Sequence, residues 1–372
     1  MVRSQHGAKS NFAPKAPSSS TTPLPPAPHA TSEGLAIDLA LCYAGHIRTY
    51  AHAAVRRNHA ASLVEPLLRS GRASVEAFAA LDVGKDRRDL YSPSTEAVVA
   101  ALRDARLVRA VVYNSDHLTT PLPANVERRA LELPSKKPPS RCVNAAKERG
   151  MLHLVPQFAK VRDAFGLALE HERSRPRRYS HLTFLRPDIY FGAAVDAAEL
   201  AAVSHTRLQT AWCKDRRRSL RAASCPAWLT RQRLPRPTAC SPNDWFSAVP
   251  RHLAPLYANV TPAASAHCHS RRDYACAYCE LGVGVAITRS PVTECVLDVV
   301  LTKMALPLEE GGGRLWPHKM MLARSIDGGG DGDGPGTARP QCSTPIGYST
   351  EWRRTHGSPN KFDCEWMARE GK

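Results

Sequence analysis

The chain has 372 residues, 43% of them hydrophobic, which is enough for one α/β domain with extensions or for two domains. Lys and Arg number 51 against 34 Asp and Glu, and the net charge of +17 favours polyanionic partners such as nucleic acid, anionic membranes or phosphorylated small molecules. No window reaches the roughly 18 uninterrupted apolar residues of a membrane span, so we expect a soluble protein without a span, whose compartment stays open. The sequence also lacks a Walker-type glycine-rich loop and a Gly-x-Ser-x-Gly elbow, which removes the commonest phosphate-cradle and serine-hydrolase interpretations.

The two ends of the chain differ in composition from the middle. The first 32 residues contain no Asp or Glu and are rich in Ser, Pro and Thr. Such a segment cannot bury enough apolar surface to order itself, so we predict a disordered tail over 1–33. Glycine-rich runs at 311–313 and 328–336 predict a flexible linker and an irregular C-terminal tail over 307–372.

Residues 34–306 alternate between strand and helix patterns. Because strands separated by helices pair in parallel through right-handed crossovers, the pattern predicts an α/β domain with a mostly parallel sheet flanked by helices. The predicted elements are a strand at Leu35–Tyr43, a helix at Tyr50–Leu68, a strand at Ser74–Leu81, a helix at Ser94–Arg106 capped by Ser94, a strand at Leu107–Tyr113 and a helix at Val143–Glu172.

The first predicted strand leads into Gly45, His46 and Arg48. A glycine permits close backbone approach at a turn, and an arginine at a strand end can bind phosphate. We therefore treat these residues as candidate contacts to a phosphorylated ligand. The alternative is an ordinary turn from strand to helix.

The most informative stretch is His181–Phe191, a β-rich run interrupted by Arg186, Pro187 and Asp188. Pro187 cannot donate to a central ladder, so we expect two short strands that break at this triplet. The break leaves Arg186 and Asp188 at a strand end, where ligands bind in open α/β sheets. A carboxylate there can hold a divalent metal, and a guanidinium can grip phosphate in a bidentate manner. The alternative is an edge turn with a solvated salt bridge between the two side chains.

A second polar motif follows, in which Asn243 and Asp244 precede Trp245 and Phe246 and lead into a predicted helix. Together with the Arg-Pro-Asp triplet and a Cys-Tyr-x-Gly-x-x-Arg turn, this motif resembles those of a group of glycosyltransferase-like proteins with a nucleotide-sugar-transferase (GT-A-like) fold. The matching positions are Cys42, Tyr43, Gly45, Arg48, Tyr179, Arg186, Pro187, Asp188, Asn243, Asp244, Phe246, Tyr257 and Glu280.

The resemblance implies transfer of a sugar from a nucleotide-sugar donor to a hydroxyl acceptor, with the sugar and the acceptor left open. It implies a catalytic set of Asp188, Asp244 and Glu280, in which Asp188 also binds a divalent metal, Mn²⁺ or Mg²⁺, and Asp244 contacts the acceptor or serves as base. For Asp244 and Glu280, a helix cap and a favourable charge at a helix start are the alternatives. The donor contacts implied are Gly45, His46, Arg48, Arg186 and Asn243.

Other features favour different classes of protein. Arginines cluster over 216–236, where they form either a solvated surface or a face for nucleic acid. His269, Cys276 and Cys279 have a spacing that suits zinc, disulfides or free thiols, and the total of eleven cysteines leaves at least one unpaired within the chain. Cys42, in an apolar strand, is expected to pack as a small hydrophobe.

The triplet strand departs from the group's pattern. His181 and Thr183 occupy positions where an aspartate or arginine is more common in the group. A transferase-like fold that has lost catalysis is therefore an alternative to an active enzyme. The others are a basic nucleic-acid-binding protein and a zinc-stabilised interaction protein.

Overall fold

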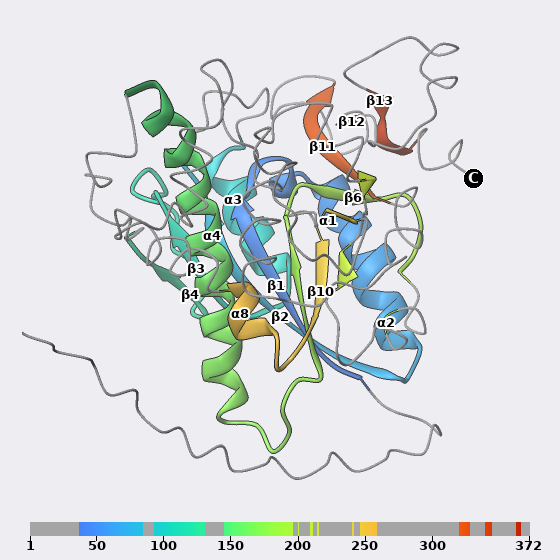
Figure 1. Cartoon of the computed structure of the whole chain (residues 1–372). Coiled ribbons are helices and arrows are strands. Elements are labelled where there is room, and N and C mark those ends of the chain that lie inside the picture. The colour runs from blue at the N-terminus through green and yellow to red at the C-terminus, as the bar shows by residue number, and fades with distance from the viewer. Residues whose placement is uncertain are drawn as a thin grey trace, which may run out of the picture. The chain divides into compact units, whose positions relative to one another are not determined.

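The computed structural model describes residues 37–84, 93–130, 145–195, 200, 209–210, 214–215, 240–241, 246–258, 320–327, 339–343 and 362–365 (Figure 1). Their strands and helices belong to one unit of the chain, Leu35–Lys372. Several predictions fall outside the described residues, namely those for the tail 1–33, the arginine cluster 216–236, Asn243, Asp244, His269, Cys276, Cys279 and Glu280.

The largest sheet has seven strands in the order β4-β3-β2-β1-β5-β10-β7. Its strands are β1 (Ile37–His46), β2 (Ala73–Asp82), β3 (Leu107–Tyr113), β4 (Val126–Arg128), β5 (His181–Leu185), β7 (Gln209–Thr210) and β10 (Phe246–Pro250). The five strands from β4 to β5 pair in parallel. β10 is antiparallel to both of its neighbours. The predicted α/β class with a mostly parallel sheet is therefore confirmed.

The single helix predicted over Tyr50–Leu68 is divided in the structure. The helical elements of the described chain are η1 (Arg48–Ala51), α1 (Ala53–His59), η2 (Ala60–Val64), α2 (Glu65–Arg69), α3 (Thr95–Asp104), α4 (Ala145–Glu172) and α8 (Ala254–Ala258). The π-helical turn η2 arises beside Pro66, which has no N–H to donate to the Ser62 carbonyl. Val195 N donates to that carbonyl instead, at 2.6 Å. Ser94 caps α3 as predicted, because its Oγ accepts from a backbone N–H of the first turn at 3.2 Å.

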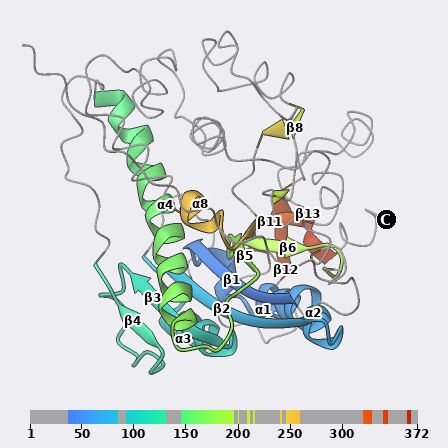
Figure 2. The ribbon, with the colours of Figure 1, turned by 60° about the horizontal axis from the view of Figure 1, so that its bottom comes forward.

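Helices cover both faces of the seven-stranded sheet (Figure 2). Successive residues of a strand point to opposite faces, so neighbours on β1 meet different helices. Cys42 Sγ lies 3.9 Å from the Ala164 carbonyl oxygen of α4, and the Tyr43 hydroxyl lies 3.4 Å from His59 Nδ1 of α1. Cys42 is fully buried, which confirms that it packs as a small hydrophobe. This burial raises the pKa of its thiol. None of the helices in the described ranges has both the length and the apolar character that crossing a bilayer requires.

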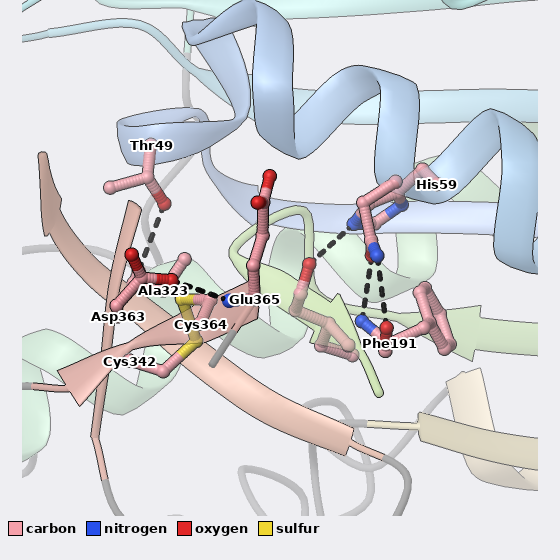
Figure 3. Close-up of a disulfide and its surroundings, with 10 residues drawn as sticks. Thr49, His59, Phe191, Ala323, Cys342, Asp363, Cys364 and Glu365 are labelled. Carbon is pink, nitrogen blue, oxygen red and sulfur yellow. Dashed lines mark hydrogen bonds between the residues drawn. A yellow bond between two sulfur atoms is a disulfide. The ribbon is translucent and has the colours of Figure 1, made fainter. Parts of the chain in front are cut away.

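A second sheet changes the prediction for the C-terminal segment. Its strands, in the order β13-β12-β11-β6, are β6 (Ile189–Phe191), β11 (Met320–Asp327), β12 (Arg339–Ser343) and β13 (Phe362–Asp363). All of its pairings are antiparallel, and a disulfide joins Cys342 to Cys364 (Figure 3). The segment 307–372, predicted as a linker and an irregular tail, therefore contains three strands of a sheet that starts from the triplet region. A separate two-stranded sheet pairs β8 (Lys214–Asp215) with β9 (Cys240–Ser241).

Candidate functional site at the carboxyl ends of β1 and β5

The order of strands reverses beside β1. From β1 the chain adds β2, β3 and β4 on one side, and it then returns to place β5 on the other side of β1. The two strands are parallel, with Tyr43 opposite Leu185, so their carboxyl ends lie side by side. Ligands of open α/β sheets bind at such a reversal because the connections diverge there. We call this position, residues 45–48 and 186–188, the switch edge.

Gly45 and Pro187 bring the two sequence motifs of the switch edge into contact. Gly45 has a φ of 144°, which L side chains rarely adopt. A Cβ at this position would also lie 3.3 Å from Pro187 Cδ. Gly45 therefore acts through the backbone, by letting the first turn approach the triplet.

Three charged side chains meet at the switch edge. Arg186 binds both oxygens of Asp188, with Nε 2.8 Å from Oδ1 and Nη2 2.7 Å from Oδ2, and Arg48 Nη1 lies 3.2 Å from Oδ2. The side chain of Asp188 is only 1% exposed, whereas those of Arg48 and Arg186 keep 22% and 16% exposure. The structure thus brings together three of the predicted site residues. Asp188 is paired with arginine, as in the turn alternative, but it is buried rather than solvated.

Asp188 does not fit the metal-binding role that the resemblance implies. Mn²⁺ and Mg²⁺ would bind it through its carboxylate oxygens, and both oxygens already accept charged hydrogen bonds from guanidinium groups. A metal ion would have to displace an arginine from a buried carboxylate and would meet two positive charges on its approach. Across the part of the chain that the structure describes, no three His, Cys, Asp or Glu side chains are grouped as a metal site requires.

His46 shapes the turn that carries Arg48. Its Nε2 donates to the Gly84 carbonyl at 2.5 Å, and its Nδ1 accepts from Arg48 N at 3.3 Å. Arg48 itself has a φ of 38°, a conformation that costs a non-glycine residue about 1–3 kcal/mol and is retained where the surroundings impose it. His46, predicted as a contact to the nucleotide-sugar donor, therefore has a clear role in fixing the backbone of Arg48.

A second polar group lies at the carboxyl ends of β2 and β3. Asp82 is opposite His46 in the β1–β2 register, and it accepts from Lys160 Nζ at 3.0 Å, from Asn114 Nδ2 at 2.9 Å and from Gly84 N at 3.0 Å. Burial acts to raise the pKa of Asp82, but the charge of Lys160 and these hydrogen bonds outweigh it and lower the pKa. Sequence reasoning missed this group. Asp82 could have been found as the polar residue that ends a predicted strand, whereas Lys160 gives no signal because it is a lysine in a long helix.

Side chains of α1 hold the strand that follows the triplet. Asn58 pairs with the backbone of Phe191 as a neighbouring strand would, with Oδ1 accepting from Phe191 N at 2.7 Å and Nδ2 donating to Phe191 O at 2.9 Å. His59 Nε2 donates to the Ile189 carbonyl at 2.6 Å (Figure 3). Burial lowers the pKa of His59 to about 4, so it is neutral at pH 7 and accepts from the Tyr43 hydroxyl through Nδ1.

β11 holds the triplet from the opposite side. Ala323 N donates to the backbone carbonyl of Asp188 at 2.9 Å. The Ala323 carbonyl accepts from Thr49 Oγ1 at 2.9 Å (Figure 3). Thr49 directly follows Arg48 in η1. One residue of β11 therefore ties together the backbone segments that carry Arg48 and Asp188.

The second motif approaches the same edge through β10. Phe246 lies opposite Leu185, the residue before Arg186, and the antiparallel register places the start of β10 at the carboxyl end of β5. The Tyr257 hydroxyl contacts Ser247 Oγ at 3.1 Å, which joins α8 to β10. Asn243, Asp244 and Glu280 are outside the described residues, so their predicted roles stay predictions.

Comparison of the sequence with models of known protein families and with curated proteins finds no match. The family resemblance therefore remains a hypothesis that depends on short motifs. The fold and the site define a class of protein: an α/β protein with a cationic cluster at the point where the order of its parallel strands reverses.

Proposed function

We propose that the protein is a glycosyltransferase that uses a nucleotide-sugar donor. The observation that carries the proposal is the meeting of Arg48 and Arg186 at the switch edge, where α/β sheets bind nucleotides. Guanidinium groups match the geometry of phosphate oxygens, so a diphosphate is a ligand that this cluster suits. The register of β10 adds support, because it brings the start of the second motif's strand to the same edge.

The proposed reaction needs positive charge and a base. The acceptor hydroxyl oxygen forms a bond to the anomeric carbon of the sugar, while the bond from that carbon to the diphosphate oxygen breaks. Negative charge develops on the departing diphosphate, and fixed cations next to it lower the barrier. The hydroxyl proton passes to a carboxylate, for which Asp244 is our candidate from the sequence.

Titration calorimetry of the full-length chain against a panel of nucleoside-diphosphate hexoses tests the proposal. We expect at least one donor to bind, and Arg186→Gln to remove most of this binding. Arg109→Gln is the matched control, because Arg109 also pairs with two carboxylates, Glu127 at 2.8 Å and Glu170 at 2.7 Å, but lies four residues before the end of β3. Donor binding should survive this control substitution.

Two outcomes would contradict the proposal. The first is the absence of binding by every donor in the panel. The second is equal loss of binding in the Arg186 and Arg109 variants, which would show a general charge effect. Tight, salt-sensitive binding to nucleic acid in the same preparation would instead favour the basic-binding alternative.

A further inference from the structure

We propose that Arg48 and Arg186 hold the diphosphate of the ligand without a divalent metal, and that Asp188 is a positioning residue for these two arginines. The inference takes the nucleotide-sugar identity of the ligand from the proposed function. Its core claim concerns only a metal-independent site for a diphosphate group, and this claim can be tested separately.

The three side chains of the cluster, Arg48, Arg186 and Asp188, differ in how deeply they are buried. Asp188 is 1% exposed, and the guanidinium-bearing side chains of Arg48 and Arg186 are 22% and 16% exposed. The negative charge is thus at the inside of the cluster, and the surface that reaches solvent belongs to the arginines. Two positive charges against one negative charge give these three groups a net charge of +1. An anion that approaches these three groups from solvent therefore meets arginine side chains before it meets the carboxylate.

The hydrogen bonds fix the arginines before any ligand binds. Arg186 makes a bidentate contact to Asp188 through Nε and Nη2, which sets the plane of its guanidinium group. Arg48 is held by its contact to the same carboxylate and, at its backbone, by the hydrogen bond to His46. Cations held in place in this way lose little conformational freedom when they bind an anion, which favours affinity.

The same contacts assign the carboxylate a role other than that of metal ligand. A metal-dependent site needs carboxylate oxygens that face the ligand, whereas the oxygens of Asp188 face two guanidinium groups. Positive charge for the diphosphate is already present at this position in Arg48 and Arg186. Asp188 orients that charge and keeps the two like-charged groups together.

Titration calorimetry with inorganic pyrophosphate on the full-length protein tests this inference, first in EDTA and then with Mn²⁺ or Mg²⁺. We expect binding in EDTA and less than a threefold change in Kd when metal is added. Arg48→Gln and Arg186→Gln should each weaken the binding in EDTA at least tenfold, and Arg109→Gln should change it less than twofold. Binding that requires metal, binding that the switch-edge variants do not weaken, or no binding in either condition would overturn the inference.

Because each glutamine variant leaves Asp188 with one positive partner fewer, its folding should be checked by circular dichroism. If a glutamine variant does not fold, Arg48→Lys and Arg186→Lys carry the test. Lysine keeps the charge but loses the planar fork, so we expect at least threefold weaker pyrophosphate binding. An unchanged Kd in both lysine variants would overturn the inference.

For Asp188, the informative measurement is pyrophosphate binding by the Asp188→Asn variant, with and without Mn²⁺. A positioning residue predicts weaker pyrophosphate binding that is equal with and without Mn²⁺, whereas a metal ligand predicts the loss of a metal-stimulated component. The outcomes also separate the two proposals. Metal-dependent donor binding would overturn this inference and leave the proposed function standing. Metal-free pyrophosphate binding without binding of any nucleotide sugar would do the reverse.

Discussion

Substitution of Asp188 by asparagine should destabilise the protein strongly, although it preserves the shape of the side chain. In the native protein, the carboxylate accepts three hydrogen bonds from two guanidinium groups at 2.7, 2.8 and 3.2 Å. An asparagine has no charge to balance the arginines, and its amide N–H₂ group would point donors toward guanidinium donors. The substitution therefore removes one partner of a buried ion cluster rather than a surface contact.

The magnitude follows from burial. Removing one partner of a buried ion pair typically costs about 3–5 kcal/mol. Since Arg48 and Arg186 are 22% and 16% exposed, water takes part of their uncompensated charge, and the lower end of about 3 kcal/mol applies. At roughly 2 °C per kcal/mol for a large domain, Tm should fall by about 6 °C.

Thermal and urea unfolding followed by circular dichroism measure this effect. Asp104→Asn is the matched control, because Asp104 also pairs with an arginine, Arg56 at 3.0 Å, but is 56% exposed. An exposed pair contributes about 0–1 kcal/mol, so Tm of the control should fall by no more than about 2 °C. Similar small shifts in both variants would show that Asp188 is solvated and would refute a buried ion cluster at the switch edge.

Three further effects on stability are expected. Gly45→Ala should lower the free energy of unfolding by about 1–3 kcal/mol in urea titrations, since φ is 144° and the new Cβ would lie 3.3 Å from Pro187; an unchanged urea midpoint would contradict this. Burial lowers the pKa of His59 from 6.5 to about 4, so the folded protein takes up the proton of this histidine at lower pH than the unfolded chain does. The free energy of unfolding should therefore be highest above pH 6.5 and fall by about 3 kcal/mol as the pH falls to about 4. His59→Gln should reduce this pH dependence. Replacing both Cys342 and Cys364 by alanine should lower the free energy of unfolding by about 3 kcal/mol, the loop-closure value for a separation of 22 residues. A urea midpoint of the native chain that does not change when reducing agent is added would contradict this.

The parts of the fold that depend on neighbouring residues could be predicted from the sequence. Pro187 breaks the strand as expected, because a proline has no N–H to donate to a neighbouring strand and this effect is local. The cap at Ser94 and the strand ending at Tyr113 follow in the same way from residues a few positions apart. The convergence of Arg48 with Asp188 could be predicted because parallel pairing alone brings strand ends together.

Burial at the switch edge could not be predicted, because it depends on contacts between distant segments. Nothing near Asp188 in the sequence indicates that its carboxylate is 1% exposed or shared by two arginines. The strand β11 could not be predicted from the sequence either. Its buried residues Met320–Ala323 form a short continuous apolar run, which has no periodicity to separate strand from helix, and glycine-rich runs on both sides suggested a linker.

Ala323 shows why the C-terminal segment belongs to the same structural unit as the switch edge. Its N–H donates to the backbone carbonyl of Asp188. Its carbonyl accepts from Thr49 Oγ1 (Figure 3), so a single residue fixes the main chain beside Arg48 and within the triplet. The position of a guanidinium group depends on the position of the backbone that carries it. The positions of the two arginines at the switch edge are therefore set by β11 as well as by the two motifs. A domain that ended at residue 306, as composition suggested, would lack β11, the strand that aligns these motifs. The disulfide between Cys342 and Cys364 secures β12 against β13 next to that strand, which extends the unit to the end of the second sheet.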